Sequence, residues 1–276
     1  MEGLKTSTIN VDGFLSPEVQ QYLNECRARY ADWFQLVQSI NRLAQLLLGE
    51  VRIDTDEPRQ SIAGLLFARV LCHAQGAVLL IERCMPTQSE VLCRASLEAL
   101  FGLLAVVEKP DIADLLVKAD RYQRRDLLKA RLSILLFHSP DADALPQVTS
   151  CLQEIEENVK RDPSPKEERK ATALKLADRA DQIGLYYSAY KLLSLPVHSN
   201  LRDLERQLGL DENGTPTSIG WGPTLEGLDH LLMTVAETLL RGVTAICRLF
   251  TLGHEEEIQV LRDRYAAQVV SVVGGA

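Results

Sequence analysis

The stretch PTQSEVLCRASLEALFGLLAVV, residues 86–107, decides the fold. Pro86 suits the first position of a helix, because the N–H that proline lacks would find no partner there. Apolar residues then occupy nearly every side of the helix: Val91, Leu92, Leu97, Leu100, Phe101, Leu103, Leu104, Val106 and Val107. A helix that is apolar all round is typical of the centre of a bundle. We therefore predict an all-α protein built around residues 87–107.

The segments next to this helix have helical periodicity too. Residues 59–84 should form an antiparallel hairpin with it, and residues 110–136 and 225–252 should flank it as further core helices. Ser16-Pro17-Glu18 is a helix start, with serine as N-cap, and predicts one long first helix over 16–48. The whole chain, 1–276, is thus predicted to be a single antiparallel helical bundle, with 1–15 as an N-terminal tail.

The middle of the chain is more polar. Residues 140–180 are highly charged and are broken by Pro163-Ser164-Pro165, which predicts exposed helices in a less compact segment. Residues 185–270 return to core helices, beginning with a short tyrosine-rich helix that ends at Pro196. Within them, residues 211–224 contain Asn213-Gly214 and two prolines, and so predict a loop.

Composition restricts the function. A formal net charge of -8 argues against general nucleic-acid binding, which needs Lys and Arg to neutralise phosphates. The six cysteines are scattered, without CxxC or zinc-finger spacing, so we expect reduced core thiols, no metal and a cytoplasmic protein. No secretory signal appears, and charged residues interrupt the apolar stretches, which predicts that the chain does not span a membrane. No motif calls for a cofactor.

Three charged residues stand out on the central helix. Glu90, Arg94 and Glu98 follow at i, i+4 spacing and share one face among apolar neighbours. A charge in such a place needs a partner, so we expect Arg94 and Glu98 to be buried and paired. A structural ion pair is one interpretation, and a functional site is the other, because perturbed charges gather at sites. In the buried case, Arg94→Ala would cost on the order of 3 to 5 kcal/mol by stranding Glu98.

Two further groups extend this constellation. On the preceding helix, Arg69 and His73 are four residues apart, and the hairpin could turn them towards Arg94, although a lone core histidine is usually structural. In the later segment, helical stepping places Tyr187, Tyr190 and Ser194 on one stripe, and His198 follows the proline turn. We expect His198 to share a concavity with Arg94, Glu98 and Tyr187. It could serve in proton transfer or simply hold the following loop.

On Arg94-Ala95-Ser96-Leu97-Glu98 and the segment from Tyr187 through Ser194 to His198, the chain resembles an uncharacterised family of bacterial all-helical proteins, over about residues 62–203. That family is distantly similar to HEPN-type bundles, many of which are metal-independent ribonucleases in defence and toxin systems. HEPN proteins place an Arg four to six residues before a His on one helix. Here Arg69 and His73 have three residues between them, and no histidine follows Arg94 on its helix.

The resemblance implies a bacterial defence or stress protein acting on RNA, as a homodimer or with a partner protein encoded nearby. His198 would take the proton from a ribose 2′-hydroxyl, and Arg94, oriented by Glu98, would stabilise charge on the phosphate. Tyr187, Tyr190, Ser194, Arg69 and His73 would line the binding site. The alternative is a non-catalytic helical module that binds a partner or a small ligand, with a structural polar cluster.

Overall fold

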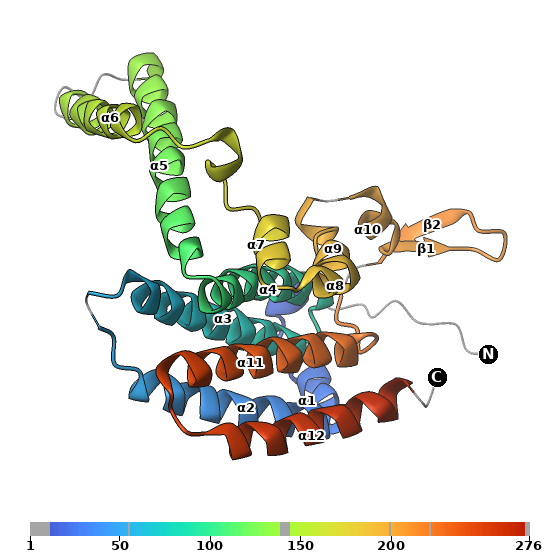
Figure 1. The fold of residues 1–276 in the computed structure, drawn as a ribbon. Helices are drawn as coiled ribbons and strands as arrows, with labels where there is room; N and C mark the ends of the chain where they lie inside the picture. The colour runs from blue at the N-terminus through green and yellow to red at the C-terminus, as the bar shows by residue number, and fades with distance from the viewer. Residues whose placement is uncertain (1–11, 55, 139–143, 199, 221, 274–276) are drawn as a thin grey trace.

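Helices make up most of the computed structural model, which describes residues 12–54, 56–138, 144–198, 200–220 and 222–273 (Figure 1). The predicted all-α class is confirmed, with one small two-stranded sheet added. Most of the predicted N-terminal tail lies outside the described residues. Its end, Gly13–Leu15, forms a 3₁₀ turn, η1.

The predicted first helix is two helices, α1 (Val19–Arg29) and α2 (Ala31–Glu50). Tyr30, with φ -112° and ψ 28°, leaves the helical region between them. Its ring is buried, and its hydroxyl donates to the carbonyl of Leu225. This tertiary contact accompanies a change of direction that periodicity alone does not reveal. As a result, α1 packs on α3 while α2 packs mainly on α11.

The predicted hairpin is present as α3 (Pro58–Glu82) and α4 (Pro86–Glu108), packed along their length. Ser96 joins them by donating a hydrogen bond to the carbonyl of Val70 at 3.1 Å. Helix α4 supplies much of the core, including the fully buried Leu97, Leu100, Phe101 and Leu103.

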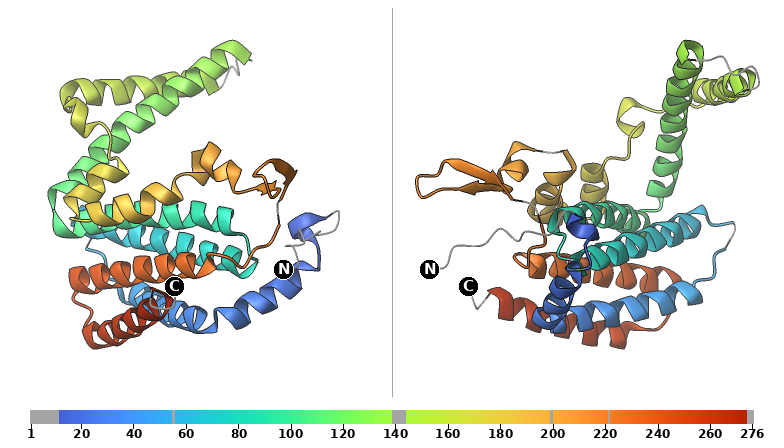
Figure 2. Two further views of the ribbon diagram at one scale, coloured as in Figure 1. Left: turned by 90° about the vertical axis from the view of Figure 1, so that its right-hand side faces the viewer. Right: turned by 180° about the vertical axis from the view of Figure 1, so that it is seen from behind.

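A second central helix, α11 (Leu228–Phe250), contacts α2, α3 and α4. Gly253, at φ +78°, turns the chain back into α12 (Glu255–Val273), which covers α11 and α2. Tyr265 of α12 meets Trp33 of α2 edge to face, with ring centroids 6.2 Å apart. The core thus lies between the α3–α4 pair and the α2–α11–α12 layer (Figure 2).

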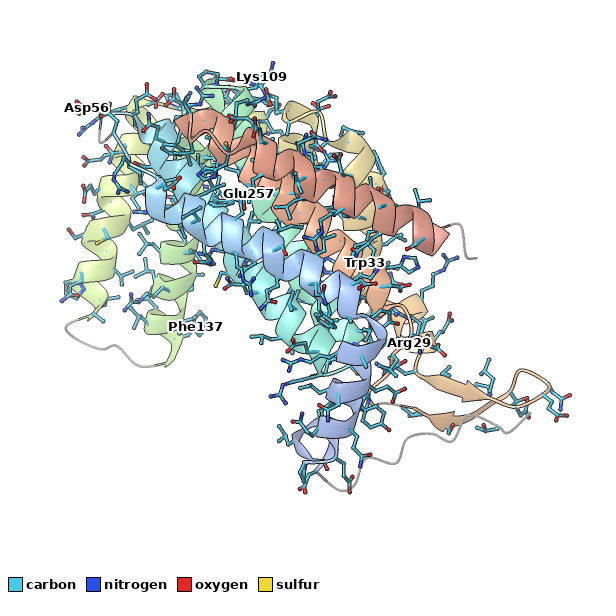
Figure 3. The ribbon with its side chains drawn as sticks, turned by 90° about the horizontal axis from the view of Figure 1, so that it is seen from below. Arg29, Trp33, Asp56, Lys109, Phe137 and Glu257 are labelled. Carbon is cyan, nitrogen blue, oxygen red and sulfur yellow. The ribbon has the colours of Figure 1, made fainter. Side chains whose placement is uncertain are left out.

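Helix α5 (Asp111–His138) departs from the prediction that it flanks α4 throughout. Only its beginning is buried, through residues such as Ile112 and Tyr122, and the rest projects from the bundle as an arm (Figures 1 and 2). Helix α6 (Ala144–Arg161) packs against the arm, and Phe137 lies near its free end (Figure 3). The second half of α5 has too few buried apolar residues to form a core helix.

The last part of the charged segment, from residue 173 on, packs against the core instead of being exposed as predicted. After the 3₁₀ turn η2 (Lys166–Glu168), α7 (Ala173–Arg179) buries Leu176 and Ala177 against α4. The chain continues through α8 (Ile183–Leu185), a π-helical segment η3 (Tyr186–Tyr190), α9 (Lys191–Leu193), η4 (Pro196–His198) and α10 (Leu201–Glu205).

The predicted loop at 211–224 is partly a β-hairpin. Strands β1 (Leu208–Leu210) and β2 (Pro216–Ile219) pair antiparallel, with Leu208 opposite Ile219. Asp211 closes the turn by accepting the backbone N–H groups of Asn213 and Thr215, and Gly214 adopts φ +79°. The residues that predicted a loop therefore make the tight turn of a hairpin.

Two helices, α3 and α11, are long and apolar enough by length and composition to cross a membrane. Core helices of a bundle pass the same test, and both pack against other helices here. That the chain does not span a membrane stays a prediction.

Candidate functional site

Arg94 lies at the centre of a polar cluster that joins α4 to the segment after α8. Its Nε donates to Ser194 Oγ at 3.1 Å, and its Nη2 donates to the Tyr190 hydroxyl at 2.8 Å. Glu98 Oε2 lies 3.4 Å from Arg94 Nη1 and accepts the Tyr190 hydroxyl proton at 3.2 Å. We call these four residues, Arg94, Glu98, Tyr190 and Ser194, the Arg94 cluster. The sequence predicted all four as site residues, and the structure brings them together.

The pairing of Arg94 with Glu98 was predicted correctly, but the burial was not. The Arg94 side chain is 21% exposed and the Glu98 side chain 46%. Tyr190 and Ser194 of the segment from η3 to α9 bond Arg94, whereas the Glu98 carboxylate stays partly in water. The ion pair is therefore half-solvated, and a solvated pair contributes much less to stability than a buried one.

The helix geometry at η3 explains which of the three tyrosines in this segment are buried against α4. The N–H of Lys191 bonds to the carbonyl of Tyr186, five residues back, as in a π-helix. Tyr186 and Tyr190 are then both buried and stacked, with centroids 5.0 Å apart, and Phe101 of α4 meets the Tyr190 ring at 5.7 Å. Tyr187 points outward and is 59% exposed. The predicted stripe assumed regular α-helical stepping, so it included Tyr187 and missed Tyr186.

The polar side chains of the cluster form hydrogen bonds with one another and with the backbone. Burial and the neighbouring Glu98 charge raise the pKa of Tyr190 to about 12, so the phenol stays protonated at neutral pH. Ser194 donates its hydroxyl proton to the carbonyl of Tyr190 at 2.7 Å. That bond directs the Ser194 proton to a carbonyl oxygen rather than to a base, and it satisfies a carbonyl near the helix end. Neither residue is arranged as a nucleophile.

His198 lies on η4, which packs next to α4. Its imidazole is exposed, and it makes no hydrogen bond or ion pair with any residue that the structure describes. It lines neither the cavity between α9 and α11 nor the cavity beside α5. The shared concavity of His198 with Arg94 therefore has no support in the contacts of the described chain.

Arg69 and His73 do not join the Arg94 cluster either. Arg69 is exposed on α3, and His73 is half-buried. Burial, together with the nearby Arg69 charge, lowers the pKa of His73, which favours the neutral ring. The hairpin forms as predicted, but its register turns Arg69 to the surface.

A groove of about 480 Å³ lies between the η3–α9 segment and α11. Aliphatic and polar side chains line it together: Glu90, Leu97, Leu185, Ser188, Ala189, Leu192, Leu193, Arg206, Gly227, His230, Leu231, Met233, Thr234, Glu237 and Tyr265. We call it the α9–α11 groove. Its η3–α9 wall belongs to the same short segment whose Tyr190 and Ser194 are held by Arg94.

The carboxylate at one end of this groove is Glu90, which the sequence grouped with Arg94. It pairs instead with Arg206, whose Nη1 lies 3.1 Å from Glu90 Oε1 and 3.2 Å from Asp203 Oδ1. Burial, opposed by Arg206, raises the pKa of Glu90. The i, i+3 spacing of Asp203 and Arg206 was a visible signal for this pair, but nothing in the sequence linked it to Glu90.

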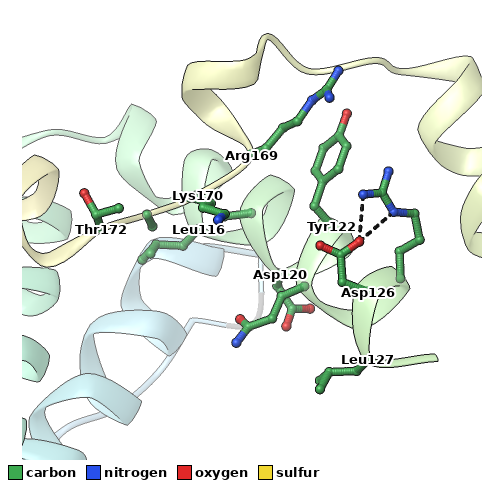
Figure 4. A pocket seen from close by; sticks show the side chains of 12 residues that line it. Leu116, Asp120, Tyr122, Asp126, Leu127, Arg169, Lys170 and Thr172 are labelled. Carbon is green, nitrogen blue, oxygen red and sulfur yellow. Dashed lines mark hydrogen bonds and ion pairs between the residues drawn. The ribbon is translucent and has the colours of Figure 1, made fainter. Parts of the chain in front are cut away.

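A larger cavity, about 740 Å³, lies between the start of the arm and residues 169–172 (Figure 4). The Tyr122 ring there has the guanidinium carbons of Arg125 and Arg169 each 5.1 Å from its centroid. Arg125 also bonds Asp126, and the Tyr122 hydroxyl accepts the N–H of Ser164 at 2.8 Å. These contacts attach the charged middle segment to α5.

The basic run of α5 is likewise occupied by ion pairs. Lys118, Arg121, Arg124 and Lys129 pair with Glu168, Asp162, Asp120 and Glu156, respectively. Each of these cations thus has a carboxylate partner within the chain, which leaves little positive charge for a phosphate backbone. In the described ranges, no group of three or more His, Cys, Asp or Glu residues could hold a metal ion.

Comparison with known proteins places the chain in a family. No curated protein and no solved structure matches it. A family of unknown function, DUF5677, matches residues 60–215, which is more than half of the 276 residues. The match contains all of the Arg94 cluster and the arm, and it ends before α11, which forms the far wall of the groove. The chain therefore belongs to the family of unknown function DUF5677.

Proposed function

We propose that this protein is a non-catalytic helical module that binds a small, largely apolar ligand in the α9–α11 groove. One observation carries the proposal: the Arg94 cluster fixes the π-helical segment from one side, and that segment forms one wall of the groove. The polar cluster then acts as a brace for the wall. Its hydrogen bonds suit that role, because Arg94, Tyr190 and Ser194 all have partners that hold them in place.

The groove has the properties of a ligand site. Its volume of about 480 Å³ falls within the range of pockets that hold small molecules, and its leucines offer apolar surface with a few polar groups at the edge. Leu192 is 65% exposed, although it belongs to the groove wall. Covering such a side chain with a ligand would remove apolar surface from water and so contribute to affinity.

Binding of a neutral apolar fluorophore tests the proposal. N-phenyl-1-naphthylamine should gain fluorescence with the folded protein, and Leu192→Gln should weaken its binding about fivefold through lost apolar contact. Leu79→Gln is the matched control, because Leu79 is 61% exposed on α3 and does not line the groove. Absence of saturable binding, or an equal effect of both substitutions, would contradict the proposal.

The HEPN-like ribonuclease hypothesis stays a prediction, together with bacterial origin and a role in defence. Its mechanism requires Arg94 to exchange Tyr190 or Ser194 for a phosphate, and His198 to approach from η4. A fluorescently labelled RNA pool, incubated with the protein and with His198→Ala, tests it. Cleavage that disappears with His198→Ala would favour the ribonuclease, and would overturn the non-catalytic proposal.

Partners and location are also predictions. A homodimer, an RNA and a protein encoded nearby each follow from the resemblance alone, and the cytoplasm follows from composition alone. Light scattering at several protein concentrations would test the homodimer directly.

A further inference from the structure

We propose that the ligand of the α9–α11 groove is an amphiphilic cation, with its ammonium group against Glu90 and its apolar body along Leu192. This assignment rests on the proposed function and adds the chemical class of the ligand. The argument has three parts: an excess of carboxylates, an aliphatic lining beside them, and the lack of a free cation for a competing anion.

The first part concerns Arg206. Its Nη1 atom serves Glu90 and Asp203 together, at 3.1 Å from Glu90 Oε1, 3.2 Å from Glu90 Oε2 and 3.2 Å from Asp203 Oδ1. The Glu90 side chain is 13% exposed and that of Asp203 is 6% exposed. Two nearly buried carboxylates thus share one guanidinium group. Buried charges are stabilised only when they are paired, so this end of the groove favours an added positive charge.

The second carboxylate of the groove comes from α11. Glu237 Oε1 accepts Nε of Arg241 at 2.6 Å, and Arg241 also donates to Gln182. Counting the groove residues and their direct ion-pair partners gives three carboxylates, Glu90, Asp203 and Glu237, against the guanidinium groups of Arg206 and Arg241. The groove and its ion-pair partners together therefore have one carboxylate more than guanidinium groups.

An aromatic ring lies beside the carboxylate on α11. Tyr265 of α12 lines the groove, and its burial, with the Glu237 charge nearby, raises the pKa of its phenol, which keeps the ring neutral. The aliphatic lining, including Leu185 and Leu192, then accommodates an alkyl or aryl body.

A ligand with an anionic head fits less well. Arg206 is the only Arg or Lys among the described residues that line the groove, and it is already bound to two carboxylates. His230 also lines the groove, and its ring makes no hydrogen bond or ion pair within the described part of the chain. An anion would therefore face Glu90 and Glu237 without a free guanidinium to neutralise it.

The test is displacement of N-phenyl-1-naphthylamine by two surfactants of equal chain length and opposite charge, each used below its micelle concentration. Decyltrimethylammonium should displace the fluorophore at a concentration about tenfold lower than decanesulfonate does. Glu90→Gln should weaken binding of decyltrimethylammonium about tenfold. Arg206→Gln should instead strengthen binding of decyltrimethylammonium, because it removes the guanidinium group that competes for Glu90.

Glu108→Gln is the matched control, because Glu108 is on the same helix, pairs with Arg248 and does not line the groove. Equal displacement by both surfactants, or stronger displacement by decanesulfonate, overturns the cation assignment while the groove remains a ligand site. Cation binding unaffected by both Glu90→Gln and Arg206→Gln overturns it as well. Failure of the fluorophore to bind at all overturns the proposed function and this assignment together.

Discussion

Arg94 on α4 donates a hydrogen bond to the hydroxyl of Tyr190, 96 positions later in the chain, at a distance of 2.8 Å. The guanidinium carbon also lies 4.9 Å from the centroid of the same ring. Arg94 therefore bonds the hydroxyl of Tyr190 and also makes a cation–π contact with its ring. These two contacts attach the π-helical segment to the bundle. The following predictions depend on that arrangement or on other specific contacts in the fold.

Tyr190→Phe should lower the free energy of unfolding by about 1 to 2 kcal/mol, because it removes the hydroxyl that Arg94 and Glu98 share while keeping the stacked ring. Urea unfolding followed by circular dichroism measures the change. Tyr187→Phe is the matched control and should stay within about 0.5 kcal/mol, since the Tyr187 ring is exposed. Equal effects of the two substitutions would contradict the assignment of Tyr190 to the cluster.

Arg94→Ala should cost about 2 kcal/mol, less than expected for a fully buried ion pair. Glu98 is half-solvated, so the loss of Arg94 does not leave a buried, unpaired carboxylate. Arg94→Lys should recover little of the loss, because an ammonium cannot reproduce the two directed bonds to Tyr190 and Ser194. A loss above about 4 kcal/mol in the same unfolding assay would show that Glu98 is effectively buried.

The pH dependence of stability should include a contribution from His254. Its hydrogen bond to Glu50 raises the pKa of the ring, and Glu257 adds to the shift. The charged form is thus favoured in the folded state. This contribution is fully present below the unfolded-state pKa of about 6.5 and disappears as pH rises through the higher folded-state pKa.

Urea unfolding of wild-type and His254→Gln proteins from about pH 5.5 to 8.5 measures this contribution. The stability difference between them should be largest at the acidic end and should shrink towards pH 8.5. A difference that is independent of pH would rule out this role for His254. Glu50→Gln should reduce the pH dependence in the same direction, because Glu50 is the main cause of the shift.

All six cysteines are free thiols in the structure, as predicted, but only four are core residues. Cys72 and Cys151 are exposed and should react quickly with dithionitrobenzoate in the native protein. Cys26, Cys84, Cys93 and Cys247 are buried and should react slowly. Burial raises the pKa of the Cys93 thiol to about 12, so little thiolate forms at neutral pH.

Unfolded, non-reduced protein should titrate six thiols. A count of four or fewer would show that disulfides form.

The sequence by itself determined the helical class, the α3–α4 hairpin and the pairing of Arg94 with Glu98. Those features depend on local patterns: apolar side chains at helical spacing bury one another, and Arg94 and Glu98, four residues apart, face each other on any α-helix. The break at Tyr30, the arm of α5 and the partner of Glu90 depend on contacts between distant segments, which spacing along the chain does not encode.

Only the tertiary structure decided which tyrosine faces the core, because the π-helical step at η3 shifts the register by about one residue relative to an α-helix. It also decided that Glu98 is half-solvated, that Arg69 faces outward and that His198 is exposed. The physical reason is the same in each case. A residue's spacing fixes its direction on its own helix, whereas its burial and its partners depend on where the neighbouring helices lie.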